Sequence, residues 1–175
     1  MFIPQVRLLA VALIALVAAP AAQAKRVKDL WATVNVCDTK KSPDDMGVRA
    51  RAPGDGTHAQ IYMRFAAQYR TSSGTWKPVD GGRSKWLRAG TALFRNQEIG
   101  YTFSFHKPEA GRSYVMRGFV QFQWRDHRKH HRRRVVVRRA QRYTEAGHPT
   151  QGAEPKRFSA AHCTIATPPK PTTGA

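Results

Sequence analysis

Acidic residues are scarce in this sequence. Its 175 residues include 11 Asp and Glu against 30 Lys and Arg, which gives a formal charge of +19 at neutral pH. Catalytic spacing motifs are missing too, because the chain has no recognisable nucleophile elbow, zinc-binding helix, phosphate-binding glycine loop or carboxylate pair. We therefore expect neither an enzyme nor a bound cofactor, although two carboxylates distant in sequence could still approach each other in the fold.

Long apolar runs are absent after the first 24 residues. Arg7 precedes an apolar run over residues 8–19, and residues 22–24 (AQA) form a small-x-small cleavage site. This is the pattern of a signal peptide that is cleaved after Ala24. An uncleaved membrane anchor, the alternative, needs about 20 apolar residues, and Pro20 interrupts this run well short of that length. The sequence therefore predicts a secreted or otherwise extracytoplasmic protein.

Cysteine is nearly absent as well. The two cysteines, Cys37 and Cys163, lie in apolar, strand-like contexts without catalytic neighbours. Disulfides persist outside the cytoplasm, so we expect the two to pair, with a free reactive thiol as the alternative. Closing so long a loop would restrict the unfolded chain by roughly 4 to 5 kcal/mol in the entropy model.

No convincing amphipathic helix is present, and alternation with period two takes its place, most clearly over residues 113–125 (SYVMRGFVQFQWR). The large apolar residues of this segment occupy even positions: Tyr114, Met116, Val120, Phe122 and Trp124. Its odd positions carry mostly polar side chains: Arg117, Gln121, Gln123 and Arg125. At roughly 3.3 Å per residue the segment would span about 40 Å as a strand. Burying one face over such a length predicts a central strand with partners on both sides.

Similar segments elsewhere are separated by turn-forming residues, which is the pattern of a β-sandwich. The expected strands cover residues 30–37, 46–52, 58–70, 75–79, 84–88, 98–106, 133–139 and 158–165. Residues 58–70 also contain helix-favouring side chains, but their alternation favours a strand. Residues 75–79 and 84–88 are expected to pair as a hairpin through a tight connection at 80–82. Residues 143–156 predict an irregular loop.

Residues 109–114 (EAGRSY) resemble the corner of immunoglobulin-like and fibronectin-type sandwiches, where an acidic and a small residue precede a tyrosine that opens the sixth strand. The tyrosine hydroxyl of such folds bonds back to the turn backbone, and the resemblance implies this role for Tyr114. Met116 departs from the antibody pattern, which has a core cysteine there. The expected Cys37–Cys163 pair instead joins the first and last strands.

The fold prediction is therefore an all-β protein, a single immunoglobulin-like β-sandwich of about seven to nine antiparallel strands over residues 25–166. A disordered tail is expected over residues 167–175. Taken whole, the mature chain resembles the small exported proteins of uncharacterised function from GC-rich soil actinobacteria. That likeness implies a compartment and no activity.

The most charged run directly follows residues 113–125. The anion-binding candidates are its Lys and Arg residues: Arg125, Arg128, Lys129, Arg132, Arg133, Arg134, Arg138 and Arg139. Guanidinium groups bind phosphate and carboxylate bidentately, and Trp124 and Tyr143 offer rings that could stack on a base or sugar. We expect a hairpin that projects from one end of the sandwich and engages a cell-wall polymer, a polysaccharide, nucleic acid, anionic lipid or a surface protein.

A solvated hairpin tip is the alternative for this run, since a GC-rich genome favours arginine codons. The protein would then be a structural exported sandwich without a specific ligand. His127, His130 and His131 form a weak metal-site candidate, because the surrounding cations oppose a bound metal ion. Asp38, Asp44 and Asp45, like residues 54–57, are expected to stabilise turns rather than to bind calcium.

Overall fold

The computed structural model describes residues 29–127 and 133–169, and it contains nine strands and no helix within these ranges. The expected signal peptide, residues 128–132 of the basic run and residues 170–175 of the tail lie outside the described residues. No helix capable of crossing a membrane occurs in the described part of the chain. The strands are β1 (Trp31–Cys37), β2 (Asp45–Pro53), β3 (Gln60–Arg70), β4 (Trp76–Arg83), β5 (Leu87–Thr91), β6 (Asn96–Ser104), β7 (Ser113–Asp126), β8 (Val135–Tyr143) and β9 (Cys163–Ala166).

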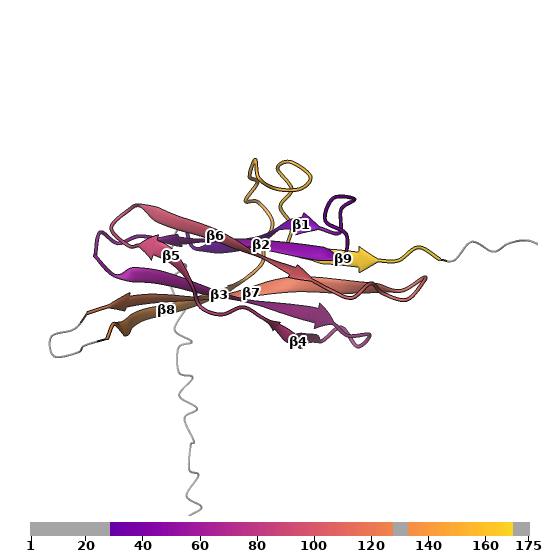
Figure 1. Ribbon diagram of the computed structural model, residues 1–175, viewed down its shortest axis with the longest axis horizontal. Coiled ribbons are helices and arrows are strands. Elements are labelled where there is room, and N and C mark those ends of the chain that lie inside the picture. The colour runs from indigo at the N-terminus through magenta and orange to yellow at the C-terminus, as the bar shows by residue number, and fades with distance from the viewer. Residues whose placement is uncertain (1–28, 128–132, 170–175) are drawn as a thin grey trace, which may run out of the picture.

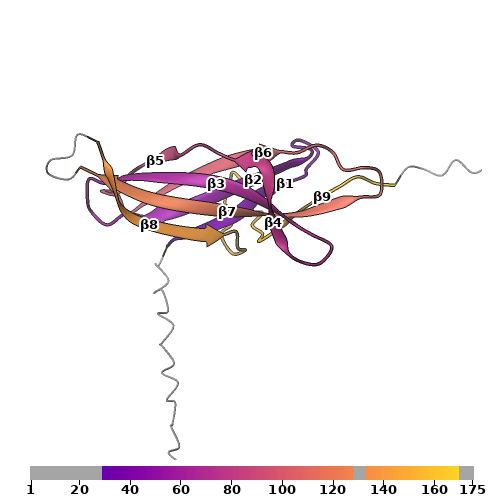
Figure 2. The same cartoon turned by 90° about the horizontal axis from the view of Figure 1, so that it is seen from below.

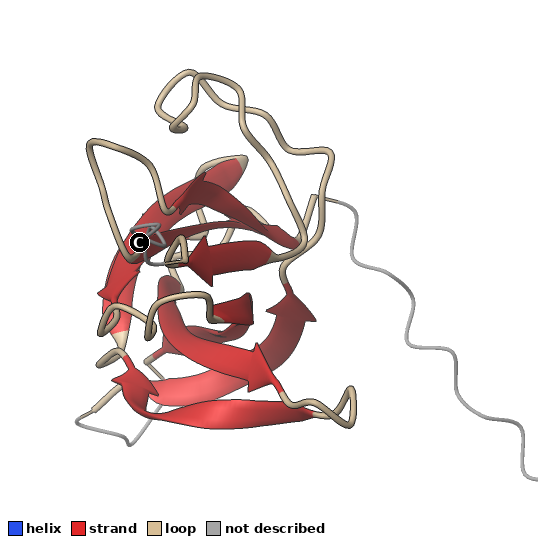
Figure 3. Ribbon diagram, turned by 90° about the vertical axis from the view of Figure 1, so that its right-hand side faces the viewer, coloured by secondary structure: helices blue, strands red, loops and turns tan. Residues whose placement is uncertain are grey.

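Two antiparallel sheets lie face to face and form the expected all-β sandwich (Figure 1, Figure 3). The smaller sheet has the order β1-β2-β6, and the larger has the order β4-β3-β7-β8. In the larger sheet β5 also pairs with β3, and β9 also pairs with β7. Immunoglobulin-like sandwiches divide their strands in the same way, with the first two and a later strand in one sheet and the third and last two in the other.

β7 is the central strand, as its alternation predicts. β3 pairs with it from Met116 to Arg125 along one edge. β8 and β9 share the other edge, with β9 beside its first residues and β8 beside the rest. The even positions from Met116 onward are buried, so the predicted register is correct: Phe122 is 1% exposed and Trp124 is 0% exposed.

The core lies between the two sheets. β3 contributes Ile61, Met63, Phe65 and Ala67, all fully buried, which confirms a strand rather than a helix for this segment. Gly118 of β7 faces the smaller sheet, and a Cβ atom there would lie 2.8 Å from Cγ2 of Val48. The sheets therefore approach each other closely at Gly118, because β7 has no side chain at this position.

The predicted hairpin between residues 75–79 and 84–88 is wrong. β4 continues through residues 80–82, and both β4 and β5 pair with β3 instead of with each other. Gly81 has a positive φ of 69° and allows a bulge where the turn was expected, so the strand continues. Residues 79–82 have no partner on β3, and pairing resumes at Arg83, which lies opposite Ala66.

The closing strand is shorter than predicted, because residues 158–162 precede β9 instead of belonging to it. They continue the irregular loop that begins after Tyr143, and this loop lies against β1 (Figure 1). Trp31 of β1 stacks on His148 of the loop with ring centroids 4.4 Å apart. The Thr33 hydroxyl lies 2.8 Å from the Ser159 hydroxyl. The long loop therefore buries the face of β1 that points away from the core.

The role that the resemblance implies for Tyr114 is not found. Tyr114 is 44% exposed, since β7 begins beyond the end of the smaller sheet. The preceding turn is held by Thr167, whose hydroxyl donates to the carbonyl of Pro108 at 2.7 Å. Backbone hydrogen bonds also join Gly111 to Thr167 and Thr167 to Arg112. The residue after the last strand therefore stabilises the corner in place of the tyrosine.

The predicted disulfide is present between Cys37 and Cys163, which are 126 residues apart in sequence. It joins β1 of the smaller sheet to β9 of the larger one. Asp38 supports the same end of the molecule: its carboxylate accepts hydrogen bonds from the backbone N–H groups of Asp44, at 2.9 Å, and Ala166, at 3.1 Å. Asp38 therefore serves as a turn residue, as predicted.

Reduction of the disulfide should lower the melting temperature, because the bond restricts the unfolded chain by roughly 4 to 5 kcal/mol in the entropy model. Mass spectrometry of the native protein should show no alkylation of either cysteine without reductant. A melting temperature that is equal with and without reductant would contradict a stabilising role, and the Cys37→Ser/Cys163→Ser variant serves as the control.

Phe122→Ala should lower the free energy of unfolding by about 3 to 5 kcal/mol, because it removes a fully buried ring. Gln123→Ala, on the opposite face of the same strand, should cost less than about 1.5 kcal/mol. Urea denaturation of the two variants measures both values. Equal losses would show that the two faces of β7 do not differ in burial.

Candidate anion-binding site

The outer face of the larger sheet carries a cluster of arginines. Even positions of β3 and odd positions of β7 point away from the core, as the alternating burial shows. Figure 2 views the molecule from the side of this sheet. The arginines on the face come from four strands: Arg64, Arg88, Arg117, Arg125 and Arg139.

Four of these arginines donate to a glutamine side chain. In each pair a guanidinium N–H group donates to the amide oxygen Oε1: Arg64 to Gln121 at 2.7 Å, Arg117 to Gln68 at 2.8 Å, Arg125 to Gln123 at 2.9 Å and Arg88 to Gln60 at 2.5 Å. The amide oxygen orients the guanidinium as a carboxylate would, but it brings no negative charge. Each pair therefore keeps its full positive charge.

Aromatic rings hold the same guanidinium groups from the side. The Arg125 guanidinium lies 4.1 Å from the ring centre of Tyr62 and 5.1 Å from that of Trp86. Trp86 is also contacted by Arg64, at 4.7 Å. Contacts of this kind are worth roughly 0.5 to 1 kcal/mol at exposed sites. They fix the position of the cations without neutralising them.

Arg117 has the same environment further along β7. Its guanidinium lies 4.3 Å from the ring centre of Trp76 and 3.9 Å from that of Tyr143. Burial lowers the pKa of Arg117 and Tyr143 raises it, and the group stays charged at neutral pH, as arginine does in proteins.

The arginines of the smaller sheet are paired differently. Arg49 and Arg51 both form salt bridges with Glu98, which lies on the neighbouring strand β6. By contrast, no carboxylate among the described residues lies within salt-bridge distance of the five arginines on the larger sheet. The larger sheet therefore presents ordered arginines without any carboxylate partner, whereas on the smaller sheet Glu98 offsets one of two positive charges.

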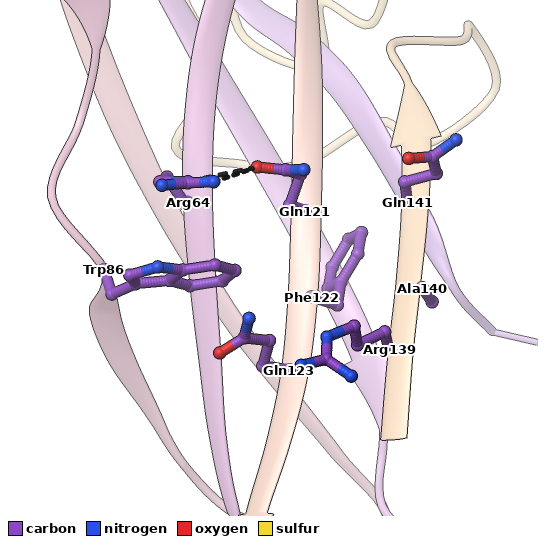
Figure 4. A pocket seen from close by; sticks show the side chains of 8 residues that line it. All are labelled: Arg64, Trp86, Gln121, Phe122, Gln123, Arg139, Ala140 and Gln141. Carbon is purple, nitrogen blue, oxygen red and sulfur yellow. Dashed lines mark hydrogen bonds between the residues drawn. The ribbon is translucent and has the colours of Figure 1, made fainter. Parts of the chain in front are cut away.

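A groove of about 470 Å³ runs over this face, and Figure 4 shows the side chains that line it. Arg64 of β3 and Arg139 of β8 lie on opposite sides of β7, with Gln121 and Gln123 between them. The remaining lining residues are Trp86, Phe122, Ala140 and Gln141. The groove thus offers guanidinium and amide N–H donors on both sides of one strand, which suits an acceptor such as phosphate, sulfate or carboxylate.

The predicted basic residues do not all belong to this face. Arg125 and Arg139 do, whereas Arg138 lies on the inner side of the sheet, with its guanidinium 4.4 Å from the ring centre of Trp124. Arg133 and Arg134 are exposed ahead of β8. Three further candidates lie outside the described residues: Arg128, Lys129 and Arg132.

The aromatic and histidine predictions have separate outcomes. Trp124 is fully buried and therefore cannot stack on a ligand, whereas Tyr143 is 46% exposed on the outer face.

His127 is exposed at the end of β7, and His130 and His131 lie outside the described residues. Within the described ranges no three His, Cys, Asp or Glu residues are grouped to hold a metal ion. Asp55 accepts a hydrogen bond from the backbone N–H of Thr57, as expected of a turn residue.

Sequence analysis missed Arg64, Arg88 and Arg117 as site residues. Arg64 and its partner Gln121 are 57 residues apart, and Arg117 and Gln68 are 49 apart. The only local indication was that four of the outward positions of β7 carry Arg or Gln. Which strand lies beside β7 could not be inferred from that pattern, so the pairs themselves could not be predicted.

His162 lies at the Arg117 end of the face. Its ring stacks on Trp76 with centroids 5.1 Å apart. Burial lowers the pKa of His162 below the ordinary value of 6.5, and the positive charges of Arg117 and Arg70 lower it further. The ring is therefore neutral at physiological pH. Its pKa depends on the neighbouring charges of Arg117 and Arg70 and can be used to detect them.

Known proteins give no further guide to this face: the chain matches no protein-family model, and no curated protein matches it. The fold and the site define an all-β sandwich with an ordered cationic outer face.

NMR titration should give His162 a pKa below about 6.5, and Arg117→Gln should raise that pKa because it removes a neighbouring cation. The unfolded chain binds a proton at about 6.5, whereas folded His162 binds one only at lower pH. The free energy of unfolding should therefore fall as the pH decreases from above 6.5 through the folded pKa. An unchanged His162 pKa in Arg117→Gln would refute the coupling, and Arg112→Gln, in the exposed turn before β7, is the control.

Proposed function

We propose that this protein is a binding module outside the cytoplasm that holds an anionic polymer on the outer face of its larger sheet. The observation that carries the proposal is the pairing of arginines with glutamines on this face. The smaller sheet, by contrast, pairs its arginines with Glu98. Ordered guanidinium groups without a carboxylate partner favour a ligand that supplies the negative charge.

The disulfide and the apolar N-terminal run support an extracytoplasmic location, because disulfides persist in oxidising compartments. The basic hairpin adds to the proposal. β7 and β8, which carry Arg125 and Arg139, are also the strands on either side of the basic run. Arg133 and Arg134, which are exposed just ahead of β8, add positive charge at this end of the two strands.

Retention on a heparin column tests the proposal. Arg64→Gln/Arg139→Gln removes two charges from the groove and should elute at lower salt than the wild type. The slope of log affinity against log salt should become shallower by roughly 1.5, since each lost contact removes about 0.7 to 0.9. Lys107→Gln/Arg112→Gln removes two charges from the exposed turn between β6 and β7 and should elute close to the wild type.

Equal shifts in the two double variants would show that net charge alone causes retention. Retention lost only in Arg132→Ser/Arg133→Ser/Arg134→Ser would assign binding to the hairpin instead of the sheet. A protein that is not retained at physiological salt would support the structural alternative, in which the charge has no specific partner.

A further inference from the structure

We infer that the polymer is an acidic polysaccharide that lies along β7, with successive acid groups at Arg125, Arg64 and Arg117. This inference rests on the proposed function and adds the class of ligand, its direction and the length of chain that is bound.

The direction follows from the sheet register. Arg64 lies level with Gln121 of β7, so the backbones of the three arginines occupy the levels of residues 125, 121 and 117, about 13 Å apart at roughly 3.3 Å per residue. The Arg125 and Arg64 guanidinium groups converge on Trp86, at 5.1 and 4.7 Å from its ring centre, so these two are at most about 10 Å apart and the whole row spans about 23 Å. Aromatic side chains lie between the charged levels, with Phe119 and Tyr143 in ring contact at 5.0 Å. The cations thus form a row parallel to the strand rather than a compact pocket.

The chemistry of the ligand follows from the hydrogen bonds. Each paired glutamine uses its amide oxygen for an arginine, so the N–H groups of Gln121, Gln123 and Gln68 are the ones that remain for a ligand. Together with the guanidinium groups they form a surface of donors, which matches the acceptor oxygens of carboxylate, sulfate or phosphate. Gln141 lines the same groove and is exposed, and its amide oxygen can accept from a sugar hydroxyl.

Nucleic acid fits the face less well because its bases need open aromatic faces on which to stack. Trp86 is contacted by Arg64 and Arg125, and Trp76 by Arg117 and His162. Tyr143 is likewise engaged, by Arg117 and Phe119. Each of these rings already has a cation against it, so fewer ring faces remain open to bases. A polysaccharide needs no such stacking, since its acid groups and hydroxyls bind through hydrogen bonds.

The test uses size-defined oligosaccharides from a polyuronate and from heparin, with oligo(dT) of matched length, in isothermal titration calorimetry with the full mature chain. Affinity should increase with oligosaccharide length until the chain spans about 23 Å and then level off. Oligo(dT) of the same span should bind at least about tenfold more weakly, because it gains no stacking energy on this face. The polyuronate and heparin arms separate carboxylate from sulfate recognition.

Variants at the ends and in the middle of the row have different expected effects. Arg125→Gln should shorten the length at which affinity levels off to about 13 Å, and Arg117→Gln should shorten it to about 10 Å. Arg64→Gln should weaken binding without changing that length, and Arg112→Gln should change neither. Two end variants are used so that the test does not depend on the stability of one of them.

Three outcomes would overturn the inference: affinity that rises steadily beyond this span, end variants that leave the length unchanged, or oligo(dT) that binds as tightly as the oligosaccharides. Tight oligo(dT) binding that is lost in Arg64→Gln/Arg139→Gln would retain the proposed function and replace the polysaccharide by single-stranded nucleic acid. If none of the polymers binds, the proposed function itself fails.

Discussion

Hydrogen bonding along both edges of β7 is the constraint on which the rest of the structure depends. A strand of 14 residues needs β3 on one side and both β8 and β9 on the other to satisfy its backbone. That requirement places β7 in the middle of the larger sheet and fixes both of its faces at once. The side chains of Phe122 and Trp124 then form core, and those of Arg117 and Arg125 form the cationic surface. The core and the cationic face are therefore the two faces of one strand. A shift of its pairing register by one residue would exchange the faces and disrupt both.

The choice of glutamine as the partner of arginine costs the fold little. An exposed salt bridge contributes only about 0 to 1 kcal/mol, so replacing the acid by an amide sacrifices little stability. Repulsion among the uncompensated cations is offset in part by their contacts with Trp86, Tyr62, Trp76 and Tyr143. Arg49 and Arg51, in contrast, share Glu98 on the smaller sheet. The two sheets thus differ in the partner they give to arginine, an amide on one and a carboxylate on the other.

The fold could be predicted from the sequence where the information is local or leaves one choice. Alternation identified β3 and β7 with the correct inward faces, and two cysteines allow one intramolecular pair. Prediction failed where distant partners decide: the glycines at 81 and 82 indicated a hairpin turn, but the segments on both sides of them pair with β3 instead of with each other. For the same reason Tyr114 was assigned a bond that Thr167 makes from the other end of the chain. The site could be predicted only in part, because its arginines are oriented by glutamines that lie on neighbouring strands and are distant in sequence.

The position of β9 has a consequence for the order in which the molecule can be completed. Its four residues cover the edge of β7 at residues 113–116 and carry the cysteine that bonds to β1. Until residues 163–166 are in place, that edge has unpaired backbone groups and no disulfide joins the two sheets. Exposed strand edges of this kind recruit strands from other chains. A protease that cut the chain before Cys163 would thus remove the disulfide and, at the same time, expose an unpaired strand edge that favours aggregation.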